Sequence, residues 1–213
     1  PPLQDETNKP FKPINSFWER TIHIAKSPID LPQKSINEPM SKSYKQRLSD
    51  ISTLIFDIDG VFTDGMVHVM PDGQLLRKMS VKDSYALQYA IKKGMIIAII
   101  TGGNSMAVHD SLQRLGVKHI FLQSRNKEQV FDTFVQKQGI TSKEVLYMGD
   151  DIPDYKVMEK AGVAVCPADA SEEIKQVSDY VSNRNGGAGC VRDIIEQTLR
   201  VQGKWFDEDA LEW

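Results

Sequence analysis

The sequence has few cysteines and no long apolar run, and each lack excludes a class of protein. Its 213 residues include only two cysteines, Cys166 and Cys190. This is too few for the disulfide framework of a secreted domain, so we expect a cytoplasmic protein. No apolar stretch approaches the ~20 residues that span a bilayer, and the first residues lack a signal-peptide pattern. We therefore expect no membrane partner, and the formal net charge of −3 argues against a nucleic-acid partner.

The composition changes along the chain and indicates one folded domain with an extension at each end. Most of the ten prolines fall within residues 1–48, which we expect to be an extended or weakly ordered appendage. Its apolar residues that could dock as a short helix are Trp18, Ile22 and Ile24. Met40 is a candidate natural start. We expect residues 49–202 to form the folded domain and the acidic, aromatic residues 203–213 to form a tail.

Apolar runs rich in β-branched residues alternate with segments of helical spacing from residue 50 onward. The runs lie at 53–57, 95–100, 118–122, 144–148 and 162–166. This alternation predicts an α/β fold of the Rossmann-like class, a parallel sheet with helices on both faces. The segment 66–81 differs, because two short runs flank the turn signal Pro71-Asp72-Gly73. It predicts a small β-hairpin flap inserted after the first strand.

Polar or glycine-rich motifs stand after several of the predicted strands. They are Asp57 and Asp59 after the first strand, Thr101-Gly102-Gly103 after the second, Lys127 after the third, and Asp150-Asp151 with Asp154 after the fourth. In open α/β sheets, ligands bind at the carboxyl ends of the strands. The topology therefore predicts that these motifs meet on one rim of the sheet.

In this order and spacing, the motifs resemble those of the haloacid dehalogenase superfamily of phosphatases. The resemblance covers residues 50–202 and includes D-x-D-G-x-x-T-D-G, a Thr-Gly pair, a lysine and G-D-D-x-x-D. A single D-x-D motif is common in ordinary turns, whereas four ordered motifs at strand ends are specific. The resemblance implies hydrolysis of a phosphomonoester through an aspartyl-phosphate intermediate.

The acidic residues of these motifs suit a metal-assisted attack on phosphorus. A phosphomonoester repels an anionic nucleophile, so the site must first neutralise it. Asp57, Asp150 and the main-chain carbonyl of Asp59 offer hard oxygen ligands for Mg²⁺, the expected cofactor. Asp57 is then the predicted nucleophile. Asp59 is the predicted proton donor to the leaving oxygen, provided that the turn at Gly60 brings its side chain there.

The remaining motifs are predicted to hold the phosphate and to support the acidic residues. Thr101 supplies a hydroxyl, Gly102 and Gly103 supply amides at a helix N-terminus, and Lys127 supplies a compact positive charge. The residues predicted to orient Lys127 or the metal ligands are Asp151 and Asp154.

The spacing of the motifs leaves no room for a large cap domain. Between Asp59 and Thr101 lie 41 residues, and between Lys127 and Asp150 lie 22. These lengths suffice for the hairpin, helices and one strand only. Either the substrate is a macromolecule or another subunit supplies a lid over the open site.

The flap sequence favours a lid from another subunit. Residues 59–87 resemble the flap region of the 3-deoxy-D-manno-octulosonate 8-phosphate phosphatase family, the small-cap branch of the superfamily. The segments 181–196, VSNRNGGAGCVRDIIE, and 199–205, LRVQGKW, resemble the same branch. The resemblance implies a homotetramer whose neighbouring subunits close each site. It also implies hydrolysis of a sugar-acid phosphate on the route to lipopolysaccharide.

Two residues depart from the family pattern and leave the sugar open. Gly103 stands where the family commonly has arginine, and Ser84 where it usually has glycine. Candidate substrate contacts are Lys82, Asp83 and Arg184, and the acidic tail is a candidate cover for a site.

Three alternatives remain from the sequence. One is a phosphatase for a nine-carbon sugar-acid 9-phosphate, of the 2-keto-3-deoxynononate or N-acetylneuraminate type. Another is a non-catalytic oligomerisation module of a sugar-acid cytidylyltransferase system, which would not need the full acidic set. The third is a broad-specificity phosphatase acting on phosphoproteins.

Overall fold

The computed structural model describes residues 42–212. The expected appendage before residue 42, with its proposed docking residues Trp18, Ile22 and Ile24 and the candidate start at Met40, lies outside the described residues. Within the described part of the chain, no helix is long and apolar enough to cross a membrane.

Six strands form one sheet in the order β5-β4-β1-β6-β7-β8, and every neighbouring pair is parallel. The strands are β1 (Thr53–Phe56), β4 (Ile96–Ile100), β5 (His119–Phe121), β6 (Val145–Met148), β7 (Val163–Cys166) and β8 (Tyr180–Val181). Strand β1 lies in the middle, with Thr53 opposite Ile96 of β4 and Val145 of β6. The parallel α/β sheet predicted from the sequence is therefore confirmed. The two-residue strand β8 was not predicted.

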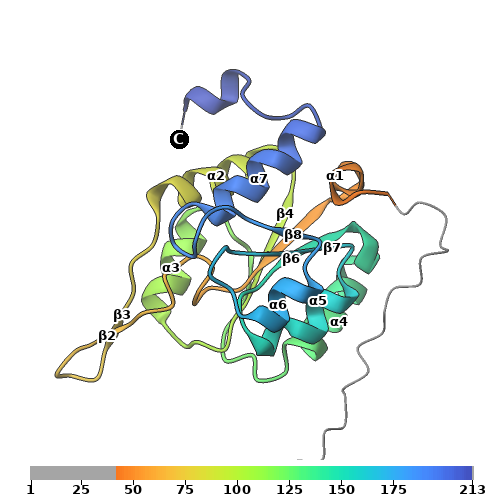
Figure 1. Cartoon of the computed structure of the whole chain (residues 1–213). Coiled ribbons are helices and arrows are strands. Elements are labelled where there is room, and N and C mark those ends of the chain that lie inside the picture. The colour runs from red at the N-terminus through yellow and green to blue at the C-terminus, as the bar shows by residue number, and fades with distance from the viewer. Residues whose placement is uncertain (1–41, 213) are drawn as a thin grey trace, which may run out of the picture. The chain divides into compact units, whose positions relative to one another are not determined.

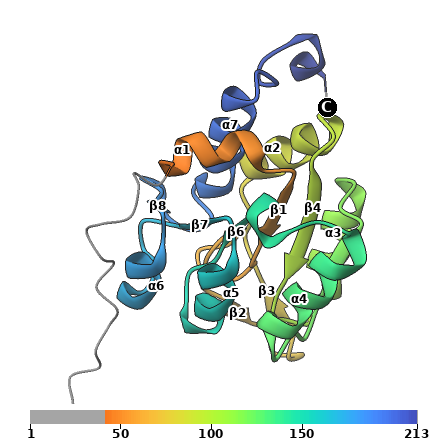
Figure 2. The same ribbon diagram turned by 90° about the vertical axis from the view of Figure 1, so that its right-hand side faces the viewer.

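Helices cover both faces of the sheet (Figures 1 and 2). They are α1 (Tyr44–Arg47), α2 (Val81–Lys92), α3 (Met106–Arg114), α4 (Lys127–Gln138), α5 (Tyr155–Lys160), α6 (Glu172–Val177) and α7 (Cys190–Val201). Short 3₁₀ turns lie at η1 (Leu48–Asp50), η2 (Ser142–Glu144), η3 (Ile152–Asp154) and η4 (Glu208–Leu211). One core cluster joins the sheet to α2, α3 and α7, and the other joins it to α4, α5 and α6.

The sequence of β1 shows why both faces must be covered. Leu54 and Phe56 belong to one core cluster and Ile55 to the other, because successive side chains of a strand point to opposite faces. All three are fully buried. A strand buried on both faces reads as a continuous apolar run rather than as an alternating pattern.

The flap is an antiparallel hairpin of β2 (His68–Val69) and β3 (Leu75–Leu76). The predicted turn is present: Gly73 has a φ of +82°, and the Met70 amide bonds the Gln74 carbonyl at 2.9 Å. The hairpin projects at the lower left of Figure 1. Both of its strands are exposed, although they carry apolar residues.

Residues at both ends of the described chain pack on the sheet domain. Helix α1 lies before the boundary expected at residue 49, and its Tyr44 ring stacks on Tyr180 with centroids 4.9 Å apart. The C-terminal segment contacts Tyr89 of α2. Asp207 accepts a hydrogen bond from the Tyr89 hydroxyl at 2.8 Å, and the Trp205 ring meets the Tyr89 ring edge to face. The tail of a chain therefore lies against its own helix α2.

Candidate active site

The ends of β1, β4 and β6 and the start of α4 surround a cavity of about 480 Å³. Its lining residues are Asp57, Asp59, Gly65, Thr101, Gly102, Gly103, Ser124, Arg125, Lys127, Asp150, Asp151, Pro153 and Asp154. The structure thus brings together the motif residues that the sequence places at the strand ends. Gly65, Ser124, Arg125 and Pro153 also line the cavity and were not predicted.

A tight turn after β1 aims the first two acids. The amide of Asp57 bonds the Met148 carbonyl at 3.0 Å and so extends the pairing with β6. Gly60 then takes a φ of +85°, and a Cβ built on it would lie 1.9 Å from Asp150 Oδ2. Only glycine tolerates both the left-handed backbone and this close approach. The glycine of the D-x-D-G motif therefore lets the first and last motifs touch.

The segment before α7 braces this turn from behind. The Gly187 amide bonds the Val61 carbonyl at 2.9 Å, and a Cβ built on Gly186 would lie 2.0 Å from the Gly60 carbonyl oxygen. The paired glycines of this segment are needed because two stretches of backbone meet here without room for side chains.

Lys127 is the central cation of the site. Its Nζ lies 3.0 Å from Asp57 Oδ2 and 2.7 Å from Asp154 Oδ1, and its side chain is only 5% exposed. Asn126 caps α4 by accepting from the Gln129 amide at 3.1 Å, which fixes where the helix begins. Burial by itself lowers the pKa of Lys127, but the neighbouring charges of Asp57 and Asp154 outweigh it and raise the pKa. Lys127 is therefore held as a cation.

Asp154 orients Lys127 and the loop after β6. Its Oδ1 accepts from Lys127 and from the Tyr147 hydroxyl at 2.5 Å, and its Oδ2 accepts from the Asp150 amide at 3.3 Å. A Cβ built on Gly149 would lie 2.4 Å from Asp154 Cγ, so the glycine is needed for this packing. Because both carboxylate oxygens are already bonded, Asp154 is placed to support the site. Asp151, by contrast, is exposed.

Asp57 and Asp150 face each other with unpaired oxygens. The Oδ1 atoms of both are buried without a hydrogen-bond partner, which is costly unless a cation meets them. Burial raises the pKa of Asp57 to about 6 although Lys127 opposes the shift. Burial and then the charge of Asp57 raise the pKa of Asp150 to about 8.

These oxygens fit a divalent cation. Carboxylate oxygens of Asp57, Asp150 and Asp154 lie within 4.8 Å of one another. Both oxygens of Asp154 already accept hydrogen bonds, from Lys127, Tyr147 and a main-chain amide. The carboxylate oxygens that remain free to bind a cation are therefore those of Asp57 and Asp150. Hard anionic oxygens are the ligands that small divalent cations prefer.

The Thr-Gly-Gly segment differs in one respect from the expectation. Helix α3 begins only at Met106, where Ser105 caps it by accepting from the Val108 amide. The Gly103 amide donates to Thr101 Oγ1 at 3.1 Å and so is not a free amide at a helix N-terminus. The Gly102 amide and the Thr101 hydroxyl remain the predicted anion ligands of this loop.

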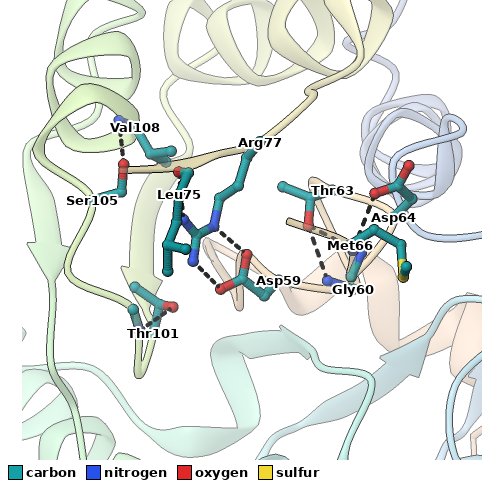
Figure 3. Close-up of polar contacts among 12 residues, drawn as sticks. Asp59, Gly60, Thr63, Asp64, Met66, Leu75, Arg77, Thr101, Ser105 and Val108 are labelled. Carbon is teal, nitrogen blue, oxygen red and sulfur yellow. Dashed lines mark hydrogen bonds and ion pairs between the residues drawn. The ribbon is translucent and has the colours of Figure 1, made fainter. Parts of the chain in front are cut away.

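Asp59 is paired with a residue that the sequence did not single out. Arg77, directly after β3, reaches back from the flap, and its Nε and Nη2 lie 2.6 and 3.0 Å from Asp59 Oδ1 and Oδ2 (Figure 3). The hydrogen bonds with Asp59 raise the pKa of Arg77. Sequence spacing gave no signal for this pair, because it depends on how the flap folds back.

The three candidate substrate contacts do not line this cavity. Asp83 is fully buried in the first turn of α2, where its Oδ1 accepts from the Arg192 amide at 2.7 Å and ties α2 to α7. Lys82 and Arg184 line a separate cavity of about 480 Å³ beside Arg192. The structure therefore places all three outside the cavity of their own chain, because α2 starts beside α7.

Comparisons with known proteins agree with this geometry. Residues 119–194 match the model of the haloacid dehalogenase-like hydrolases. A 3-deoxy-D-manno-octulosonate 8-phosphate phosphatase of Escherichia coli K12 is 36% identical over 166 residues, 78% of this chain and 88% of that protein. The chain belongs to this phosphatase family. It is therefore a phosphatase of the haloacid dehalogenase type, as the motifs predicted.

Solved structures of the same family share the fold. The 3-deoxy-D-manno-octulosonate 8-phosphate phosphatase of Moraxella catarrhalis, solved with a magnesium ion, a phosphate ion and a KDO molecule, aligns with a TM-score of 0.74 at 32% identity. The alignment covers 76% of this chain and 92% of that one. The Yersinia pestis phosphatase aligns with a TM-score of 0.75 at 30% identity, over 81% and 93% of the two chains.

Proposed function

We propose that the chain is a Mg²⁺-dependent phosphatase that hydrolyses 3-deoxy-D-manno-octulosonate 8-phosphate. The observation that carries the proposal is the pair of unpartnered buried oxygens on Asp57 and Asp150, beside Lys127. It is supported by the family membership and by the magnesium and KDO named for the Moraxella structure. A non-catalytic oligomerisation module would have no use for this arrangement.

Asp57, Asp150 and the main-chain carbonyl of Asp59 would hold the Mg²⁺ ion. When bound, the ion offsets the repulsion between the phosphate oxygens and the carboxylate of Asp57. Lys127 adds a second positive charge, fixed by its bonds to Asp57 and Asp154.

Asp57 would act as the nucleophile. One of its oxygens is bonded to Lys127, and the other has no partner. Attack on phosphorus breaks the bond to the leaving oxygen, to which Asp59 gives a proton. Asp59 then takes a proton from the water that hydrolyses the aspartyl phosphate. The products are inorganic phosphate and the free sugar acid, and both aspartates return to their first state.

The phosphate would be bound by groups from the loop after β4 and by Lys127. Thr101 is buried at the end of β4 and lines the cavity. Together with the Gly102 amide and Lys127, it would hold the phosphate oxygens during both steps. Asp154 keeps Lys127 in place. Asp151 would help to orient the metal ligands without binding the ion directly.

The enzyme would work as a cytoplasmic homotetramer that assembles through its flaps, with residues of neighbouring subunits closing each site. The support is the exposed apolar flap, where Val69 is 74% and Met66 72% exposed. Exposed apolar strands of this kind pack against other chains. The support for the cytoplasm is that Cys166 and Cys190 are both free and buried.

A nine-carbon sugar-acid 9-phosphate is the second candidate substrate. The observation that favours it is Gly103, because a glycine at this position lacks the substrate contact that the family's common arginine could make.

A substrate panel tests the proposal. Phosphate release would be measured from the eight-carbon and nine-carbon sugar-acid phosphates and from neutral sugar phosphates, with Mg²⁺ and with a chelator. The highest kcat/KM is expected for the eight-carbon ester, with no turnover in the chelator. Faster hydrolysis of a nine-carbon ester would replace the substrate assignment, and Mg²⁺-independent turnover would contradict the mechanism.

A further inference from the structure

The contact between Arg77 and Asp59 conflicts with the proposed role of Asp59 as the proton donor to the leaving oxygen. The guanidinium bonds both carboxylate oxygens of Asp59, and its Nη1 also donates to the Leu75 carbonyl at 3.2 Å. The Arg77 side chain is only 8% exposed. A carboxyl group that gives its proton to a leaving oxygen must turn its O–H toward that oxygen, and the two-point contact with the guanidinium holds Asp59 in one orientation. The pair must open or shift when substrate binds.

The guanidinium lies against the side of the cavity where Gly103 has no side chain. A Cβ built on Gly103 would lie 3.5 Å from Asp59 Oδ2, 3.5 Å from Thr101 Oγ1 and 3.7 Å from Arg77 Nη2. A long side chain at position 103 would therefore grow into the space that Arg77 uses. Figure 3 shows Arg77 reaching down to Asp59, with Thr101 at the lower left. The flap thus brings a cation to the leaving-group side of the cavity.

We propose that Arg77 is a specificity-determining residue that leaves Asp59 when substrate binds and pairs with a carboxylate on the leaving group. A guanidinium held in a two-point bond by one carboxylate is geometrically suited to another carboxylate. A neutral leaving group offers no equal partner, so opening the pair would leave the arginine unpaired. The inference rests on the proposed function, because it assumes that the phosphomonoester hydrolysed is that of a sugar acid.

The flap offers a matched control beside Arg77. Lys78 is the next residue and also pairs with an acid, Asp64, at 2.9 Å, but its side chain is 78% exposed. Neither Arg77 nor Lys78 lines the cavity itself, but Arg77 bonds Asp59, which does, whereas Lys78 bonds Asp64, which does not. Lys78→Gln removes one flap charge as Arg77→Gln does, without touching Asp59.

The test compares an acidic with a neutral phosphomonoester. The kcat/KM of wild type, Arg77→Gln, Arg77→Lys and Lys78→Gln would be measured on 3-deoxy-D-manno-octulosonate 8-phosphate and on D-arabinose 5-phosphate, which has no carboxylate. For Arg77→Gln we expect a loss of about tenfold or more on the acidic ester, mostly through KM, and no loss on the neutral one. Arg77→Lys should lose less, and Lys78→Gln should match wild type on both.

Equal losses of Arg77→Gln on both esters would overturn the proposal, since they would mean that Arg77 only orients Asp59. No loss on either ester would overturn it as well. The substrate assignment is tested separately by the preference of the wild type. If wild type prefers N-acetylneuraminate 9-phosphate, the kcat/KM of each variant on that ester is compared with its kcat/KM on the neutral one. A wild type that prefers no acidic ester would contradict both proposals.

Discussion

The charged side chains at the ends of the strands find their partners within one chain, whereas the flap exposes apolar residues that one chain does not cover. Asp57 and Asp154 are buried and both bonded to Lys127, whereas the flap strands are exposed and the flap contacts the site through Arg77, which bonds Asp59. The ion cluster of Asp57, Lys127 and Asp154 is held by the sheet, so its geometry is fixed before any ligand arrives. The residues of β2 and β3 belong to neither core cluster. This contrast suggests that the chemistry resides in the sheet and that substrate selection resides in the flap.

The largest effect is expected at the nucleophile of the cluster. Asp57→Asn keeps the shape but removes the anionic oxygen, so turnover should fall by about 10³-fold or more. The flap is untouched, and the oligomeric state should equal that of wild type. Phosphate-release assays and light scattering check the two halves of this prediction. Activity near that of wild type in this variant would exclude a covalent mechanism.

The second prediction concerns stability and compares Asp154 with Asp151, two acids of the G-D-D-x-x-D motif. Asp154→Ala removes the partner of the Tyr147 hydroxyl and one of the two carboxylates bonded to Lys127, and should lower the free energy of unfolding by about 1–3 kcal/mol. Asp151→Ala removes an exposed side chain and should change it by less than about 0.5 kcal/mol. Urea unfolding of both variants measures the difference. Similar values for the two would show that the buried network does not stabilise the domain.

The flap should control assembly without affecting the fold. Val69→Glu puts a charge on the exposed apolar surface of β2, and we expect it to convert a tetramer into smaller species. Val201→Glu, at the exposed end of α7, is the control and should remain a tetramer. Light scattering gives the mass, and thermal unfolding shows whether the monomer stays folded. A wild-type monomer would refute the lid from a neighbouring subunit.

The smallest effect is a pH dependence that metal should reverse. Burial raises the pKa of Asp57 to about 6 and of Asp150 to about 8, so the folded state binds protons that the unfolded chain has lost. The stability that these protons give is present below about pH 4 and is lost as the pH rises towards 8.

This prediction can be checked by thermal unfolding of metal-free protein between pH 5 and 8. The contribution of these two groups should lower Tm by several degrees across this range, and Asp150→Asn should flatten the curve. Added Mg²⁺ should raise Tm most at the alkaline end, where both carboxylates are charged. A Mg²⁺ effect that is largest at pH 5 would contradict the assignment of the ligands.

The sequence predicted the sheet and the meeting of the motifs because both depend on local patterns. Continuous β-branched runs specify strands buried on both faces, and parallel strands place the loops at their carboxyl ends on one rim. The close approach of Gly60 to Asp150 is a consequence of that topology. The sequence therefore predicts best the site residues whose positions are set by neighbouring strands.

Other contacts depend on how separate elements pack, and no local pattern encodes them. The Arg77–Asp59 pair requires the flap to fold back over β1, which spacing does not reveal. Asp83 was expected to contact substrate, but the packing of α2 on α7 turns it inward to the Arg192 amide. The Gly103 amide was expected to be free, but the side chain of Thr101 accepts its hydrogen bond.

The most direct test of the mechanism is to look for phosphate on Asp57 during turnover. Wild-type enzyme with Mg²⁺ and 3-deoxy-D-manno-octulosonate 8-phosphate would be quenched in acid within one turnover and analysed by peptide mass spectrometry. We predict a phosphorylated peptide whose modification maps to Asp57 and disappears on a longer incubation. Rapid phosphate release with no label on Asp57, or with label on another residue, would contradict the central claim.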